Sequence, residues 1–378
     1  MPNAAFHSRI TALALECAGI CDTGELAERF CNYPDYVFEE NSAESADYMF
    51  YLDNIQFHYP PHTPVEEFYR YWRVDNGVAR QIFTQGNANR RHVESGFEYY
   101  LSRTVELLRA GNRREAWKFL GCLLHFLEDS TFGIHVFEGA NGTDIYALDR
   151  MSGVDAAKYL CSMPVSEDLW QMRVNPEVFA DTVAEAVAVL YRRYAQAGES
   201  SRQALFRIAL NHICNANISD VAANEKIMFK NVLQITADTI ATAVAIADGS
   251  APRRNERNLC ELEPDIYPIG GGGGFRLRHY QQSGNTVSFG VNLDSHLLYN
   301  IPADVYQKFT AKLQACDVKK AEVSLICNDR VIDSFTISGN AEYDLQITEP
   351  TGRCGLRITS DTPQGAVALI NGVFWRKQ

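Results

Sequence analysis

The run LLHFLEDSTFGIH places three potential metal ligands, His125, Asp129 and His135, at the end of a segment with helical periodicity. His125 and Asp129 are four residues apart, so on a helix their side chains project from one face, one turn apart. His135 follows Gly133, a residue that helps to end the helix. Imidazole and carboxylate groups are ligands that zinc prefers. The run therefore predicts a metal site, and a capped helix end carrying two unrelated histidines is the structural alternative.

The first 250 residues have the apolar periodicity of α-helices. This period occurs at 8–18, 43–53, 79–110, 113–129, 178–197, 202–217 and 226–247. In the segment 113–129, Asn112 suits an N-cap, and the Leu-Leu-His-Phe-Leu stretch is apolar nearly all round. We therefore expect this helix to be central and His125 to be buried, where it needs a polar partner or a metal.

The sequence pattern changes after residue 250. Segment 251–275 contains prolines and five consecutive glycines, which predict a linker. Over 276–378, short alternating runs rich in β-formers are separated by turn signals, which is typical of an antiparallel sandwich. The predicted fold class is multidomain α + β: a mainly α-helical bundle at 1–250, then a jelly-roll-like antiparallel β-sandwich.

The composition and charge of the chain limit the classes of protein to which it can belong. The chain has 378 residues, a net charge of −12 and 46% hydrophobic residues, which indicates a soluble globular protein. The acidic balance argues against a large nucleic-acid surface, but an acidic enzyme whose metal ions supply positive charge fits it. The sequence contains no run of about 18 apolar residues, so it predicts no membrane span. The ten cysteines form no Cys-x-x-Cys pair, so neither a zinc ribbon nor a thioredoxin motif is indicated. The first residues do not read as a signal peptide, so we expect a cytoplasmic protein, or an extracellular one if a leader was removed.

Three further candidate ligands precede the run: His7 in FHSRITA, Asp35 in NYPDY and His58 in FHYPP. Taken alone, each has a structural reading as a helix-start residue, a turn residue or a packed ring. Their order, followed by AGNRREAWKFLGCLLHFLEDSTFGIH with its H-x3-D-x5-H run, resembles the zinc-dependent phospholipase C family. It also resembles the related fungal single-strand nucleases.

The resemblance implies a cluster of two to three zinc ions. Asp129 would bridge two of them. One of these ions would also take Asp35, His58 and His125. The other would take His7 and, in the family, the amine and carbonyl of the first residue of the chain.

The resemblance implies that a third zinc starts from His135. The family continues with another His and then an acidic residue, whereas this chain has no His between His135 and His212. Asp144 and Asp149 are the carboxylates available in that region, and we expect Asp144 to be the ligand. His212 on a later helix has a structural role in this reading.

Paired zinc ions suit hydrolysis of phosphate esters, because they clamp the phosphate and provide hydroxide from a water whose pKa is about 7. The resemblance implies a phosphodiester hydrolase of the phospholipase C type, in which Asp35 and Asp129 are catalytic. Its substrate would be a phospholipid or a phosphodiester in a glycan or glycolipid, reached at a peripheral membrane surface in the lipid case. Two alternatives are a single-strand nuclease of the same fold and a non-catalytic glycan-binding protein with a decayed metal site. No P-loop, G-x-G-x-x-G or G-x-S-x-G motif competes.

Residues 290–378 resemble NPCBM-type carbohydrate-binding modules. The features in common are an Ile-Pro turn, Phe309-Thr310-Ala311, and two strands around an Asn-Asp turn. The resemblance implies a sandwich that presents loops to a glycan. Phe374 and Trp375 end an apolar strand, where core packing is the expected role and sugar stacking is the alternative.

Overall fold

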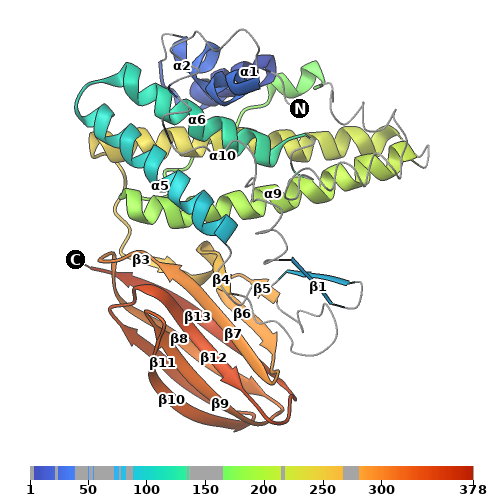
Figure 1. Cartoon of the computed structure of the whole chain (residues 1–378), viewed down its shortest axis with the longest axis vertical. Coiled ribbons are helices and arrows are strands. Elements are labelled where there is room, and N and C mark those ends of the chain that lie inside the picture. Colours follow the sequence, from blue (N-terminus) through green and yellow to red (C-terminus); the bar gives the residue numbers. More distant parts are fainter. Residues whose placement is uncertain are drawn as a thin grey trace. The chain divides into compact units, whose positions relative to one another are not determined.

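The chain divides into two compact units, one of residues 1–68 and 89–252 and one of residues 69–88 and 253–378. The computed structural model describes residues 4–21, 24–38, 50, 54, 72–75, 78–81, 88–133, 136, 165–213, 218–266 and 281–377. The first unit is helical and the second is built of antiparallel strands (Figure 1). The predicted fold class, a helical bundle followed by a two-sheet β domain, is confirmed.

The helical unit is organised around one central helix. Its described helices are α1 (Ala4–Ala18), α2 (Glu25–Glu28), the 3-10 helix η1 (Phe30–Phe38), α5 (Ala88–Arg109), α6 (Arg113–Thr131), η6 (Glu167–Gln171), α9 (Val183–Ile213) and α10 (Ile218–Asp248). Helix α6 contacts α1, α2, η1, α9 and α10. Among the described residues, no helix is long and apolar enough to cross a membrane.

Helix α6 is the helix that the sequence places at the centre. Asn112 caps its N-terminus by accepting a hydrogen bond from the Glu115 amide at 3.5 Å. The helix ends at Thr131, because Phe132 is extended and Gly133 has a φ of 72°. Every residue from 119 to 131 is buried. The expectation of a central helix that buries His125 is confirmed.

Two helical predictions need correction. Helix α9 (Val183–Ile213) spans parts of both predicted segments, 178–197 and 202–217, and runs through the polar AGESS stretch between them. The Asn231 side chain on α10 bonds to the hydroxyls of Ser200 and Ser201, each at 3.0 Å. Because a neighbouring helix satisfies these polar groups, the stretch stays helical.

The second correction concerns the start of the segment 79–110. Residues Val78–Gln81 form strand β2, antiparallel to β1 (Trp72–Asp75). The DNGV sequence between the strands contains Asn-Gly, a strong hairpin signal that the helical pattern obscured. The predicted helix at 43–53 lies almost entirely outside the described residues.

The β unit consists of two sheets. One has the strand order β10-β9-β12-β7-β4, and the other has the order β11-β8-β13-β6-β5, with β3 also paired to β13. The strands are β3 (Glu256–Asn258), β4 (Pro264–Ile266), β5 (Gln281–Ser283), β6 (Thr286–Gly290), β7 (Asp294–Ile301), β8 (Tyr306–Cys316), β9 (Val318–Cys327), β10 (Arg330–Gly339), β11 (Glu342–Thr348), β12 (Gly352–Thr359) and β13 (Ala366–Arg376). Strands β3 and β4, with η7 (Leu259–Glu261) between them, lie within the segment 251–275 that the sequence predicts as a linker.

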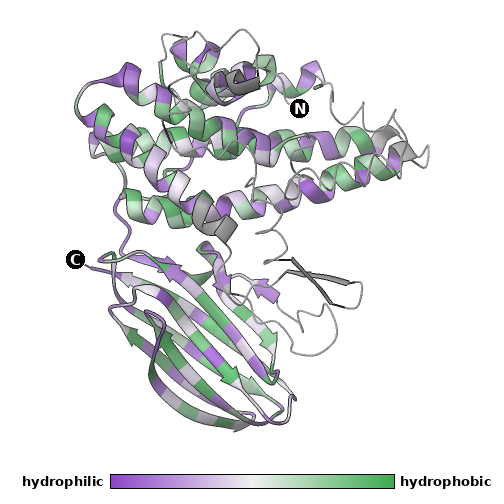
Figure 2. Ribbon diagram, in the orientation of Figure 1, coloured by the Kyte–Doolittle hydropathy of each residue, from purple (hydrophilic) through white to green (hydrophobic). Residues whose placement is uncertain are grey.

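The sheets bury alternate residues of their strands. Along β8, for example, Phe309, Ala311, Leu313 and Ala315 are buried, and polar residues lie between them. Figure 2 shows this alternation of hydrophobic and hydrophilic residues in several strands. Phe374 is buried as expected, whereas Trp375 is half-buried and donates a hydrogen bond to Thr310 Oγ1 at 2.9 Å. The apolar faces thus form a core between the sheets.

Candidate metal centre

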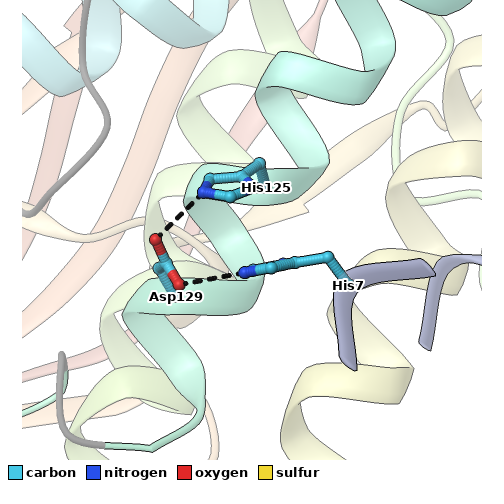
Figure 3. A group of neighbouring side chains, drawn as sticks. All are labelled: His7, His125 and Asp129. Atoms are coloured by element: carbon cyan, nitrogen blue, oxygen red, sulfur yellow. Dashed lines mark ion pairs between the residues drawn. The ribbon is translucent and has the colours of Figure 1, made fainter. Parts of the chain in front are cut away.

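Helices α1 and α6 bring His7, His125 and Asp129 together in the interior of the helical unit (Figure 3). Each of the two Asp129 carboxylate oxygens faces a different imidazole. Oδ1 lies 3.3 Å from Nε2 of His7, and Oδ2 lies 3.3 Å from Nε2 of His125. The two imidazole rings stack with their centroids 4.0 Å apart. All three side chains are at most 1% exposed, so the group lies in the buried interior of the unit.

The Nδ1 atoms of both histidines point away from Asp129 to oxygen atoms that fix the rings. His125 Nδ1 lies 2.6 Å from the carbonyl oxygen of Cys31, and a carbonyl can only accept, so Nδ1 carries the proton. His7 Nδ1 lies 2.7 Å from Glu128 Oε2. Histidines that bind metals characteristically use one ring nitrogen while the other donates to a carbonyl or carboxylate. Both rings therefore direct Nε2 toward Asp129 and leave that atom to bind a metal.

A close contact between α6 and η1 sets the position of the Cys31 carbonyl. Gly121 lies one turn before His125 on α6, and a Cβ atom at this position would be 2.5 Å from the carbonyl carbon and oxygen of Phe30. Only glycine permits the two backbones to lie so near. The same approach brings Asp35 on η1 to the site, with its Oδ1 atom 3.6 Å from His125 Nε2. The Asp35 side chain is 18% exposed, so it lies on the solvent-facing side of the group.

Glu128 is the functional residue that the sequence reading missed. Its side chain is fully buried, and its Oε1 atom accepts a hydrogen bond from Thr11 Oγ1 at 2.8 Å. His7 and Thr11 are four residues apart on α1, so both meet the same carboxylate. A Glu inside the apolar LLHFLED stretch was the available signal, because a buried carboxylate needs partners on a neighbouring element.

The buried carboxylates control the protonation of His7. Burial alone would lower the pKa of His7, but the hydrogen bonds and charges of Asp129 and Glu128 outweigh it and raise the pKa from 6.5 to about 10. Burial also raises the pKa of the Glu128 carboxyl, although His7 and Thr11 oppose that shift. Without a metal, the carboxylates thus hold His7 as an imidazolium. A divalent cation beside His7 would balance the same negative charge.

The donor set fits zinc. Imidazole nitrogens and carboxylate oxygens are its usual ligands in proteins, and one ligand atom from each of His7, His125 and Asp129 lies within 4.8 Å of the others. Asp129 has the orientation of a bridging carboxylate. On one side it faces His125, which Asp35 also approaches, and on the other it faces His7.

The remaining predicted ligands lie outside the described residues. These are His58, His135 and Asp144, together with the alternative Asp149. The side chain of His212 also lies outside the described part of the chain. The predicted third zinc site therefore stays a prediction. Of the seven metal ligands named from the sequence, the structure brings together His7, Asp35, His125 and Asp129.

Comparison with known proteins finds no matching protein family and no matching curated protein. Solved structures similar to the chain include an α-toxin from an avian strain of Clostridium perfringens, with 10% identity, 99% of this chain and 95% of that chain covered, and a TM-score of 0.37. The α-toxin of Clostridium absonum shows 12% identity, 100% and 88% coverage, and a TM-score of 0.35. A CBM36 domain of a xylanase from a termite hindgut metagenome shows 16% identity over 29% of this chain and 92% of its own, with a TM-score of 0.20. These likenesses are too distant to indicate an activity, which must be inferred from the side chains.

Proposed function

We propose that this protein is a zinc-dependent phosphodiester hydrolase of the phospholipase C type. The observation that carries the proposal is the geometry of Asp129, whose two oxygens face the Nε2 atoms of two different histidines in a buried site. A protein interior tolerates such a concentration of ionisable groups when they are paired or bind metals. The hydrogen bonds from Nδ1 to Glu128 and to the Cys31 carbonyl orient both rings for that purpose.

The described residues divide into distinct roles in this proposal. Bound zinc would supply positive charge for the phosphate and a nucleophilic water at neutral pH. Asp129 would hold two ions, one together with His7 and one together with His125 and Asp35. Asp35 is the most exposed of the four ligands, so it is also the best placed to meet water and to accept its proton as a general base.

The proposed substrate is a phospholipid or a phosphodiester within a glycan or glycolipid. It follows from the resemblance of the ligand order to the zinc-dependent phospholipase C family. The two-sheet β unit would act as a glycan-binding module, as the resemblance of residues 290–378 implies. Neither substrate class depends on a transmembrane helix.

Metal content and hydrolysis test the proposal together. Any affinity tag is placed at the C-terminus, because the family uses the amine of the first residue as a zinc ligand. The purified protein is expected to contain two or three zinc ions per chain, as measured by mass spectrometry of the metals. It should release a phosphorylated head group from phosphatidylcholine vesicles. The Asp129→Asn variant should lose zinc and at least about 100-fold of the activity, since the bridging charge is gone. Asp220→Asn, a change on the exposed face of α10, is the matched control and should leave both values unchanged.

Other outcomes point elsewhere. Absence of zinc after purification with zinc in the medium would overturn the proposal. Cleavage of single-stranded DNA without cleavage of phospholipid would favour the single-strand nuclease. Absence of both zinc and hydrolysis would favour the non-catalytic glycan-binding protein with a decayed metal site.

A further inference from the structure

Two cysteines lie side by side at one end of the five-stranded sheet in the β unit. Strands β9 and β12 pair antiparallel as far as Gly355 and Ile326. Cys354 and Cys327 are the next residues of the two strands beyond this pair. Their sulfur atoms are 3.4 Å apart, so the two thiols are in contact.

The distance between the two sulfurs permits a covalent bond. The sulfur atoms of a disulfide lie about 2.05 Å apart. From a separation of 3.4 Å, small rotations of the two side chains bring the sulfurs to this distance.

The surroundings of the two sulfurs give them different access to solvent. Cys354 is 1% exposed, donates to the Thr351 carbonyl at 3.0 Å and accepts from the Thr351 amide at 3.2 Å. Cys327 is half-buried, and besides its contact with the Cys354 sulfur, its own sulfur has long contacts of 3.9 Å to the carbonyls of Glu349 and Thr351. A soluble reagent therefore reaches the sulfur of Cys327 more readily than the buried sulfur of Cys354.

We propose that Cys327 and Cys354 form a disulfide when the protein meets a low-molecular-weight disulfide such as oxidised glutathione. The Cys327 thiolate attacks one glutathione sulfur, the glutathione S–S bond breaks, and one glutathione thiolate leaves. The Cys354 thiolate then attacks the Cys327 sulfur of the mixed disulfide and releases the second glutathione. The two cysteines lose two protons and two electrons, and one oxidised glutathione becomes two reduced molecules.

The chemistry of Cys354 supports this order of events. Burial and the neighbouring Cys327 raise the pKa of the Cys354 thiol to about 12. A thiol that stays protonated is a poor first nucleophile. It is still well placed as the second one, because the sulfur that it must attack is its immediate neighbour.

The bond would join two turns that already touch. The Asn328 amide donates to the Thr351 carbonyl at 3.1 Å, and the Asp329 amide donates to the Arg353 carbonyl at 3.4 Å. Arg353 also pairs with Asp329 at 3.3 Å. Oxidation would therefore fasten the β9–β10 turn to the β11–β12 turn and close the intervening chain into a loop.

Thiol mapping of the full-length protein tests the proposal. The protein is incubated in reduced or oxidised glutathione, quenched with N-ethylmaleimide, digested and analysed by mass spectrometry. The oxidised sample should contain a peptide pair linked through Cys327 and Cys354, two hydrogens lighter than the separate peptides. Its β unit should melt about 10 °C higher than that of the reduced sample, because the closed loop restricts the unfolded chain.

Two serine variants control for other thiols. Cys327→Ser changes a half-buried side chain, so it should fold, lack the linked peptide and show no difference in melting between reduced and oxidised samples. Cys316→Ser removes an exposed thiol at the end of β8 and should leave the link and the shift intact. The proposal is overturned if both cysteines are still alkylated after oxidation. It is also overturned if glutathione stays attached to Cys327 or if either cysteine links to a different one.

Discussion

The close approach of α6 and η1 at Gly121 leads to a specific prediction about the candidate metal centre. In Gly121→Ala, the new Cβ atom would lie 2.5 Å from Phe30 backbone atoms, whereas ordinary van der Waals contact begins at 3.4 Å. The η1 backbone must therefore retreat by about 0.9 Å. This shift would lengthen the 2.6 Å hydrogen bond from His125 Nδ1 to the Cys31 carbonyl and would displace Asp35 from its position 3.6 Å from His125.

The cost in stability follows from two opposing effects. Overpacking of a core costs about 1–3 kcal/mol, and replacing glycine by alanine within a helix returns about 1 kcal/mol. We expect Gly121→Ala to lose up to about 2 kcal/mol of unfolding free energy. The matched control is Gly198→Ala on α9, where the Cβ would lie 3.4 Å from the Ser130 carbonyl oxygen. That variant should be slightly more stable than the wild type.

The metal affinity gives the decisive readout. Loss of an outer-shell partner of a ligating histidine lowers metal affinity by about 10–100-fold. We therefore expect that reduction in Gly121→Ala, measured by zinc competition against a fluorescent chelator, and no reduction in Gly198→Ala. The reasoning would be refuted if Gly121→Ala bound zinc as tightly as the wild type, since the α6–η1 contact would then play no part in orienting His125.

The other predictions concern the partners of His7 and an ion pair of the β unit. Glu128→Gln removes the charge that faces His7 Nδ1 and should weaken zinc binding about 10–100-fold in the same competition assay, so unchanged affinity would exclude an outer-shell role. Thr11→Val removes the 2.8 Å hydrogen bond to Glu128 and should cost about 1–3 kcal/mol in urea unfolding, with a smaller loss of zinc affinity than Glu128→Gln. Burial acts to raise the pKa of Asp294, but Arg357 and His296 outweigh it and lower that pKa below 3.8. The charged Asp294 therefore stabilises the fold above pH 3.8, and its contribution is lost as the pH falls through the lowered pKa. The melting temperature of Asp294→Asn should accordingly lie below that of the wild type at pH 6 and approach it by pH 2.5; a difference independent of pH would contradict the assignment.

The sequence was sufficient for the elements whose signals are local. The apolar circumference of 113–129 predicted a central helix, and the N-cap at Asn112 and the glycine at 133 marked its two ends. The turn-separated alternating runs after residue 276 predicted the antiparallel sheets. In each case the residues that decide the element lie within it or next to it.

The sequence was not sufficient where a distant element decides. The continuity of α9 depends on Asn231 of α10, and the role of Glu128 depends on Thr11 and His7 of α1. The meeting of His7, Asp35, His125 and Asp129 was predicted by their order and family resemblance, because periodicity alone does not specify which helices pack together. The roles of His58, His135 and Asp144 remain predictions.

The contact between His7 and Glu128 joins residues that are 121 positions apart. A ribosome delivers His7 early and Asp129 only after the intervening helices have been made, so the nascent chain lacks the carboxylate that His7 and His125 share until α6 has emerged. Closing so long a loop has an entropic cost that a shared cation would help to offset. Because such a cation binds the folded arrangement and not the dispersed ligands, its concentration in the compartment of synthesis would influence how firmly the first helix stays docked.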